Sequence, residues 1–263
     1  MKIYFLEQVC YLGNCIISLT NVINLCKKEG VKFSTDLSKF WKKIPFIEIE
    51  KIPFFVREFD SNDCLIKSNF FHSTIAISKE ERLEIIEKYI KPYTNFSFRQ
   101  IPETTCVIHI RSGEIFDAGG THKNYIQPPF AFYQKIIDEE KYERFLVVTQ
   151  NDRRNPTIEL IEKYSKKVEV QSSTLRDDLS VILSASSIVA GFGTFLSQVL
   201  FFNSNIKKIY CLDYTDYFSY FGTNAELITY KLLDQYVPVG KWTNSLEQLS
   251  MMINYPVEKI ERL

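Results

Sequence analysis

Two residues that suit phosphate binding stand at the end of an apolar run of the sequence. The run covers residues 106–110 and contains His109, and Arg111 and Glu114 follow it. An arginine offers a planar fork of N–H donors that stays charged and fits phosphate oxygens. Side chains alternate along an extended chain, so His109 and Arg111 point to the same face. Taken singly, such a histidine is more often a core residue and such an arginine a solvated charge, so the pair is the stronger signal.

A second polar group lies in the segment GFGTFLSQV, where an apolar run meets a predicted helix. Gly191 and Gly193 permit close approach of the backbone, and free amides at a helix start bind anions. Thr194, Ser197 and Gln198 follow in the same segment. The spacing matches neither a P-loop nor the dinucleotide-binding fingerprint. A tight strand-to-helix turn needs the same glycines for its geometry alone, so both interpretations stay open.

Carboxylates stand near two further strand ends. Asp177 and Asp178 lie in the first turn of a predicted helix, where negative charge interacts favourably with the helix dipole. Asn151, Asp152 and Arg153 follow another apolar run, and a solvated polar loop is the usual interpretation of such a stretch.

The elements that must position these residues alternate regularly after residue 104. Asn155 is predicted as a helix cap with Pro156 at the first helical position, and prolines stand in the first turn of the helix at 127–140. Strands that are apolar almost throughout, separated by helices, favour an α/β fold with a parallel sheet covered on both faces. Ligands bind beyond the carboxyl ends of such strands, which is where Arg111 lies. The predicted strands are 105–110, 144–149, 168–171, 187–191 and 207–213, and the helices are 127–140, 154–167, 173–186 and 193–203.

The first hundred residues predict a smaller α/β lobe. Strands are expected at 2–9 and 31–34, with a helix at 13–30 that Gly30 ends and a capped helix at 78–93. Residues 36–78 match no pattern. We therefore expect two domains, a lobe of residues 1–100 on the acceptor side and a nucleotide-binding domain of residues 101–263 that closes with a helix at 244–255.

The composition excludes several classes of partner. Lysine plus arginine and aspartate plus glutamate both number 32, so no overall field attracts nucleic acid or an acidic membrane. Six cysteines without zinc-type pairing are interpreted as reduced thiols, and Cys106 and Cys211 as small core residues. The longest apolar stretch, 188–202, is shorter than the roughly 20 residues of a membrane-spanning helix. These features predict a cytoplasmic protein whose only membrane contact would be peripheral.

Four segments, taken in order, resemble the fucosyltransferase superfamily. HIRSGE at 109–114 resembles its H-x-R-x-G/T-D signature, with Glu114 in place of the aspartate. QPPFAFY, VVTQNDRRNP and TLRDDLSVILSASSIVAGFGTFLSQV follow in the order of the α1,6 family, so the resemblance covers residues 104–213. YLGNC near the N-terminus is similar to a Gly-Asn-Gln segment of several such enzymes, although Cys15 replaces the glutamine.

The resemblance implies a GT-B-like fold with a Rossmann-type C-terminal domain. It also implies an inverting transfer of fucose from GDP-fucose to a glycan acceptor, without a metal or other cofactor. Asp178 would substitute for a guanine-binding aspartate that aligns with Val181. Glu114 and Asp117 are the acids nearest the strand end that can serve as the base. The residues assigned to the nucleotide are His109 and Asp178 for guanine, Arg111, Thr194, Ser197 and Gln198 for the phosphates, and Asn14 at the cleft between the lobes.

Two other functions fit the same residues. The displaced aspartate allows a donor other than GDP-fucose, and the short N-terminal lobe allows a binding module without turnover. An unrelated α/β protein with coincidental polar strand ends is the weakest alternative, because four matches occur in order. The leading hypothesis is a glycosyltransferase of cell-surface polysaccharide or glycoconjugate synthesis, with its linkage and oligomeric state left open.

Overall fold

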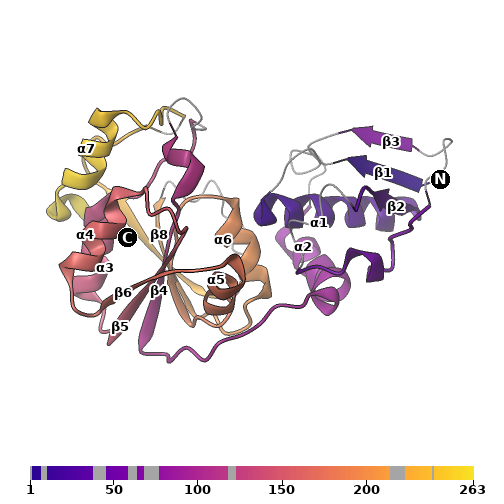
Figure 1. Cartoon of the computed structure of the whole chain (residues 1–263), viewed down its shortest axis with the longest axis horizontal. Coiled ribbons are helices and arrows are strands. Elements are labelled where there is room, and N and C mark those ends of the chain that lie inside the picture. Colours follow the sequence, from indigo (N-terminus) through magenta and orange to yellow (C-terminus); the bar gives the residue numbers. More distant parts are fainter. Residues whose placement is uncertain are drawn as a thin grey trace. The chain divides into compact units, whose positions relative to one another are not determined.

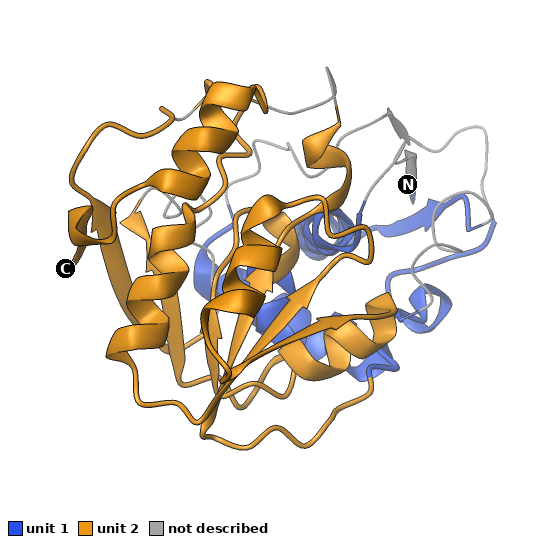
Figure 2. Ribbon diagram, turned by 60° about the vertical axis from the view of Figure 1, so that its left-hand side comes forward, with its two compact units in different colours: residues 1–96, 197–202, 220–222 blue, residues 97–196, 203–219, 223–263 orange. Residues whose placement is uncertain are grey.

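The computed structural model describes residues 2–6, 11–37, 46–58, 64–67, 77–117, 123–213, 223–238 and 240–263. Two compact units divide the chain, and Figure 2 colours them separately. The first consists of residues 1–96, 197–202 and 220–222, and the second of residues 97–196, 203–219 and 223–263. The second unit contains every strand that was predicted after residue 104.

The first unit is a small parallel sheet with its own helices (Figure 1). Its three strands have the order β2-β1-β3, and both pairings are parallel. The strands are β1 (Lys2–Leu6), β2 (Lys32–Thr35) and β3 (Cys64–Lys67). The helices are α1 (Leu12–Glu29), the short η2 (Ile49–Lys51), and α2 (Lys79–Ile85) continued by η4 (Ile86–Ile90) and η5 (Lys91–Tyr93).

Local signals set the helix ends of this unit. Gly30 adopts the left-handed conformation with φ 65° and donates its N–H to the Cys26 carbonyl, which ends α1 as predicted. Ser78 and Glu81 form a reciprocal capping box at the start of α2. Within the unassigned stretch 36–78 the structure adds β3 and η2, while 38–45, 59–63 and 68–76 lie outside the described residues.

The second unit is built on a seven-stranded sheet of order β10-β9-β8-β7-β4-β5-β6. Every neighbouring pair is parallel except β9 and β10, which are antiparallel. The predicted α/β class with a mostly parallel sheet is therefore confirmed. The strands are β4 (Thr105–Ile110), β5 (Arg144–Thr149), β6 (Val168–Ser172), β7 (Ser187–Val189), β8 (Lys208–Leu212), β9 (Glu226–Leu232) and β10 (Ile260–Arg262).

Helices cover both faces of this sheet, with α3, α4 and α7 packed together on one face and α5 on the other (Figure 1). Asn155 caps α4 as predicted, accepting a hydrogen bond from the Thr157 N–H. Pro129 is the N-cap of α3, so the prolines precede that helix and do not form its first turn. The helices of this unit are α3 (Phe130–Glu139), α4 (Pro156–Tyr164), α5 (Leu175–Ile182), α7 (Leu246–Asn254) and the short η6 (Gly113–Phe116) and η9 (Val257–Lys259). Helix α6 (Thr194–Val199) begins in this unit, and its residues from 197 on belong to the first unit, together with η7 (Leu200–Phe202).

The core of the second unit forms around β4, whose six residues are all buried. Cys106 and Cys211 lie in it and form no disulfide with another described residue, as the sequence predicted, and the same holds for the buried Cys15 and Cys26 of the first unit. Cys10 and the side chain of Cys64 lie outside the description. Among the described helices, none has both the length and the apolar character to cross a membrane.

Candidate functional site

The candidate site lies where the strand order reverses. The chain runs from β4 outward to β5 and β6, then returns to place β7 on the other side of β4. In open α/β sheets ligands bind beyond the carboxyl ends of the strands at such a reversal. Arg111 directly follows β4, and the turn of residues 190–193 directly follows β7. The two segments singled out in the sequence therefore flank the reversal point.

The guanidinium of Arg111 packs against the turn after β7. Its Nη1 lies 3.1 Å from the place that a Cβ on residue 193 would occupy. Gly193 has φ 130°, a backbone conformation that residues other than glycine rarely adopt. Glycine is thus required here both by the backbone conformation and by the closeness of the arginine.

Two neighbours hold the Arg111 side chain, which is only 15% exposed. Its Nη2 is 2.5 Å from Oε1 of Glu114, an ion pair within one turn of chain. Its Cζ lies over the Tyr125 ring, 4.4 Å from the centroid, which is a cation–π contact. No sequence pattern singles out Tyr125, because only the fold brings its ring under the guanidinium.

The loop that carries Arg111 is fixed by the loop after β5. Ser112 donates its N–H to Gln150 Oε1 at 3.0 Å and its hydroxyl to Asp152 at 2.7 Å, and Asp152 also accepts the Gly113 N–H at 3.1 Å. Asn155 donates its amide to the Arg111 carbonyl at 3.0 Å. Partial burial raises the pKa of Asp152, but hydrogen bonds from Ser112 and Arg154 outweigh it and leave that pKa below its ordinary value. The stretch interpreted as a polar loop is therefore the support of Arg111.

Gly113 meets this support closely. It has φ 79°, and a Cβ there would come within 2.5 Å of Gln150 Nε2. The R-S-G order of the signature therefore has a structural reason. The loop can turn away from β4 and still receive both anchors only if residue 113 has no side chain.

Both acids proposed as the base are paired with arginines. Glu114 is bound to Arg111, and Asp117 is bound to Arg154, which also donates to Asp152 at 2.7 Å. The Glu114 side chain is 37% exposed and Asp117 is more open than that. A role in proton transfer would require either carboxylate to leave its arginine first.

His109 is a buried, neutral imidazole at this edge of the sheet. The residue is 8% exposed, and burial together with the charge of Arg111 lowers its pKa to about 4. Nδ1 is buried and has no hydrogen-bond partner among the residues that the structure describes. The ring lies 5.4 Å from the Phe195 ring, with their planes 31° apart. Nδ1 lies against the turn after β7, 3.1 Å from the place that a Cβ on Gly191 would occupy.

The remaining predicted nucleotide residues divide between the units. Thr194 begins α6 and is half-buried in the same unit as Arg111. Ser197 and Gln198 are buried, and Gln198 donates its amide to the Ser197 hydroxyl at 3.5 Å. These two residues and Asn14 belong to the first unit. Within the second unit the structure therefore groups Arg111 with Glu114, Gly193 and Tyr125.

Asp178 stands further along the sheet, on α5. It accepts a hydrogen bond of 3.2 Å from Gln171 on β6, and β5 separates that strand from β4. Burial raises its pKa to about 6, against the smaller lowering effect of the Gln171 hydrogen bond. The carboxylate is therefore held at the edge of the sheet in a setting that penalises its charge.

The Asp178→Asn variant should be more stable than the parent at neutral pH. A raised pKa in the folded state gives stability that is present at low pH and lost as the pH rises through about 6. The amide removes that loss and can still accept from Gln171. We expect about 1 to 2 kcal/mol of added unfolding free energy at pH 7.5, after allowing for the water that reaches the carboxylate. Urea denaturation at pH 7.5 and 4.5 tests this, and a gain that grows toward low pH would contradict it.

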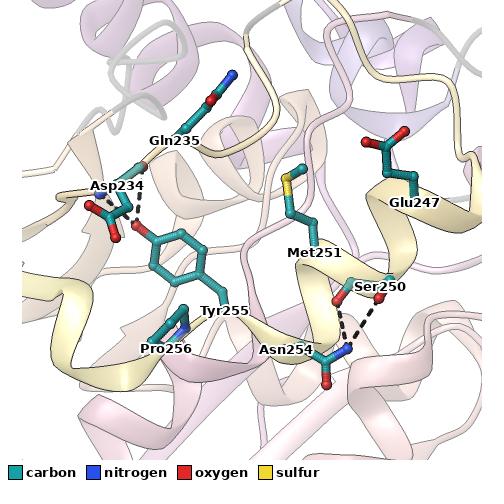
Figure 3. A pocket seen from close by; sticks show the side chains of 8 residues that line it. All are labelled: Asp234, Gln235, Glu247, Ser250, Met251, Asn254, Tyr255 and Pro256. Carbon is teal, nitrogen blue, oxygen red and sulfur yellow. Dashed lines mark hydrogen bonds between the residues drawn. The ribbon is translucent and has the colours of Figure 1, made fainter.

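A separate hollow of about 480 Å³ lies in the second unit, lined by residues of α7 and of the segments that follow β9 and α7 (Figure 3). Its polar groups are largely used internally: the Tyr255 hydroxyl accepts from the Asp234 N–H at 3.0 Å, and Asn254 donates to the Ser250 carbonyl at 3.0 Å. It shares no residue with the group around Arg111. The lining residues are Asp234, Gln235, Glu247, Ser250, Met251, Asn254, Tyr255 and Pro256.

No known protein family and no curated protein matches the sequence. Among solved structures, the chain is similar to the bacterial iron-containing dodecameric glycosyltransferase TibC from enterotoxigenic E. coli H10407, with 10% identity, 98% of this chain and 67% of that chain covered, and a TM-score of 0.50. The chain has the GT-B glycosyltransferase fold. Two further solved structures are also similar to the chain. NodZ α-1,6-fucosyltransferase soaked with GDP-fucose has 10% identity over 80% of this chain and 94% of that chain, with a TM-score of 0.49. The E. coli heptosyltransferase WaaC with ADP has 10% identity over 96% of both chains, with a TM-score of 0.45.

Over the described ranges, no three histidine, cysteine, aspartate or glutamate residues gather as a metal site would require.

Proposed function

We propose that this GT-B protein is a glycosyltransferase whose Arg111 binds the diphosphate of a nucleotide-sugar donor beside the glycine turn after β7. The observation that carries the proposal is the position of the guanidinium, 3.1 Å from the place of a Cβ on Gly193. A fixed positive fork and a side-chain-free backbone turn meet at the reversal of strand order. That combination suits an anion better than a neutral ligand.

The proposed chemistry is charge stabilisation of the leaving group. As the bond from the sugar to the nucleoside diphosphate breaks, negative charge grows on the phosphate oxygens. A preorganised cation in a partly dehydrated site stabilises that charge more strongly than water does. Arg111, which is 15% exposed, would supply this effect without a metal ion.

GDP-fucose is the proposed donor and a glycan the proposed acceptor, in cytoplasmic synthesis of a cell-surface polysaccharide or glycoconjugate. The ordered resemblance of residues 104–213 to fucosyltransferases supports this choice. His109 would contact guanine, and Thr194 would join Arg111 at the phosphates. The proposed set also contains Asp178 for guanine, Ser197 and Gln198 for the phosphates, and Asn14.

Inverting transfer needs a base near the acceptor hydroxyl, within about 3 Å in the productive complex. Glu114 is the proposed base and Asp117 the second candidate. Each is held by an arginine in the structure, so each would act only after that ion pair opens.

Nucleotide binding tests this proposal most directly. GDP at 100-fold its Kd should stabilise the protein by about 2.7 kcal/mol, which raises the melting temperature by several degrees. UDP at the same concentration should stabilise it less, and GDP-fucose with a glycan mixture should release GDP. No stabilisation by millimolar GDP, UDP or ADP would remove the nucleotide-sugar assignment.

A different donor is the second candidate. TibC has also been solved in complex with ADP-D-β-D-heptose, with 9% identity to this chain, 94% of this chain and 65% of that chain covered, and a TM-score of 0.50. Asp178 is bound to Gln171 on the edge strand, which weakens its assignment to guanine. Hydrolysis of a panel of GDP-, UDP- and ADP-sugars distinguishes the donors. Tight nucleotide binding without transfer or hydrolysis would instead indicate a binding module. The ion pairs of Glu114 and Asp117 with arginines favour this alternative, because neither carboxylate is then available as a base.

A further inference from the structure

The fork of Arg111 already holds an anion within the chain. Oε1 of Glu114 lies 2.5 Å from Nη2 of Arg111, the distance of a short charge-assisted hydrogen bond. A carboxylate oxygen and a phosphate oxygen are acceptors of the same kind for a guanidinium. Glu114 therefore occupies donors that the proposed function gives to the diphosphate.

Contacts other than the one with Glu114 also hold Arg111 in place. The Tyr125 ring lies under the guanidinium at 4.4 Å, and the Gly193 turn adjoins Nη1 on another side. The backbone of Arg111 is fixed through its carbonyl, which accepts from Asn155 at 3.0 Å. These three supports remain when the carboxylate moves away.

Glu114 is the partner that can move. Its side chain is 37% exposed, against 15% for Arg111. It stands in the short η6 turn on a rotatable stem, while the Gly113 N–H just before it is held by Asp152 at 3.1 Å. The carboxylate can swing into water while the loop beneath it stays in place.

We propose that Glu114 is an intramolecular counter-ion, which neutralises Arg111 in the empty protein and is displaced when the donor diphosphate binds. The inference rests on the proposed function of Arg111. A diphosphate carries more charge than a carboxylate, so it displaces Glu114 from the fork. Displacement frees the carboxylate only after the donor is bound, so donor binding precedes the step that needs a base.

The test is the affinity of Glu114→Gln for two anions, inorganic pyrophosphate and GDP, measured by isothermal titration at one pH and salt concentration. Removing a competing ion pair should tighten both Kd values by about three- to ten-fold relative to the parent protein. Glu114→Ala should tighten them in the same direction, which covers a failure of either variant to fold. Glu159→Gln is the matched control, because it breaks an exposed ion pair with Lys163 on α4 and should leave both Kd values unchanged.

The outcomes distinguish a failure of this inference from a failure of the proposed function on which it rests. If the parent protein binds the anions but both Glu114 variants bind equally or more weakly, Glu114 braces Arg111 or does nothing, and the counter-ion role is overturned while the proposed function survives. If the parent protein binds neither pyrophosphate nor any nucleotide, the proposed function itself fails. Tyr125 provides an independent check: Tyr125→Leu removes the ring under the guanidinium and should bind several-fold more weakly than the parent. Equal binding by the leucine variant would remove the support that lets Glu114 leave.

Discussion

Arg111→Ala should weaken GDP binding about 100-fold and abolish sugar transfer, because two charge-assisted hydrogen bonds to a partly buried anion together contribute about 3 kcal/mol. The side chain is 15% exposed and lies against the Gly193 turn, so neighbouring cations cannot easily replace it. Titration calorimetry with GDP and a transfer assay with GDP-fucose measure the two effects.

Arg111→Lys separates the charge from the fork. Lysine keeps the positive charge but loses the planar pair of donors and the stacking on Tyr125, so we expect about a tenfold loss of affinity. Arg144→Ala is the matched control, since that arginine pairs with Glu169 at 2.5 Å at the opposite end of β5. Parent-like GDP binding by Arg111→Ala would show that the nucleotide, if it binds, binds elsewhere.

Gly191→Ala should destabilise the protein by about 3 kcal/mol. A Cβ at residue 191 would lie 2.5 Å from the His109 carbonyl oxygen and 3.1 Å from its Nδ1. The first contact is with backbone of the central strand β4, which cannot move without disturbing the sheet. The melting temperature should fall by roughly 6 to 12 °C, and urea denaturation gives the free energy directly.

Gly30→Ala is the control for this variant. Gly30 has φ 65°, so alanine is strained there, but no atom lies within 4 Å of its Cβ position. The expected loss is about 1 kcal/mol, which is the usual cost of placing a residue with a side chain in the left-handed conformation. Gly191 does not have a positive φ, so its expected loss comes from the close contact alone. A loss no larger than that of Gly30→Ala would mean that the structure yields to the added methyl group, and that the approach of β7 to β4 does not require glycine at 191.

The order of elements from residue 105 to residue 213 was predictable because each depends on a short-range signal. Apolar runs marked β4, β5 and β8, and the side chain of Asn155 caps its own helix. The same holds in the first unit, where Gly30 ends α1. The failures have equally local causes. β9 mixes exposed and buried residues on a strand near the sheet edge, so it lacks the apolar run that identifies a central strand. Tyr125 lies outside every regular element.

The sequence by itself determined that an arginine and a glycine turn stand at strand ends in an α/β chain. Only the tertiary structure decided that β7 returns to lie beside β4, which brings the two together. The partners that fix the Arg111 loop are 38 to 44 residues away along the chain. Caps and periodicity act within a few residues and can be recognised in a linear sequence, whereas such contacts exist only after the sheet has set which strands are neighbours.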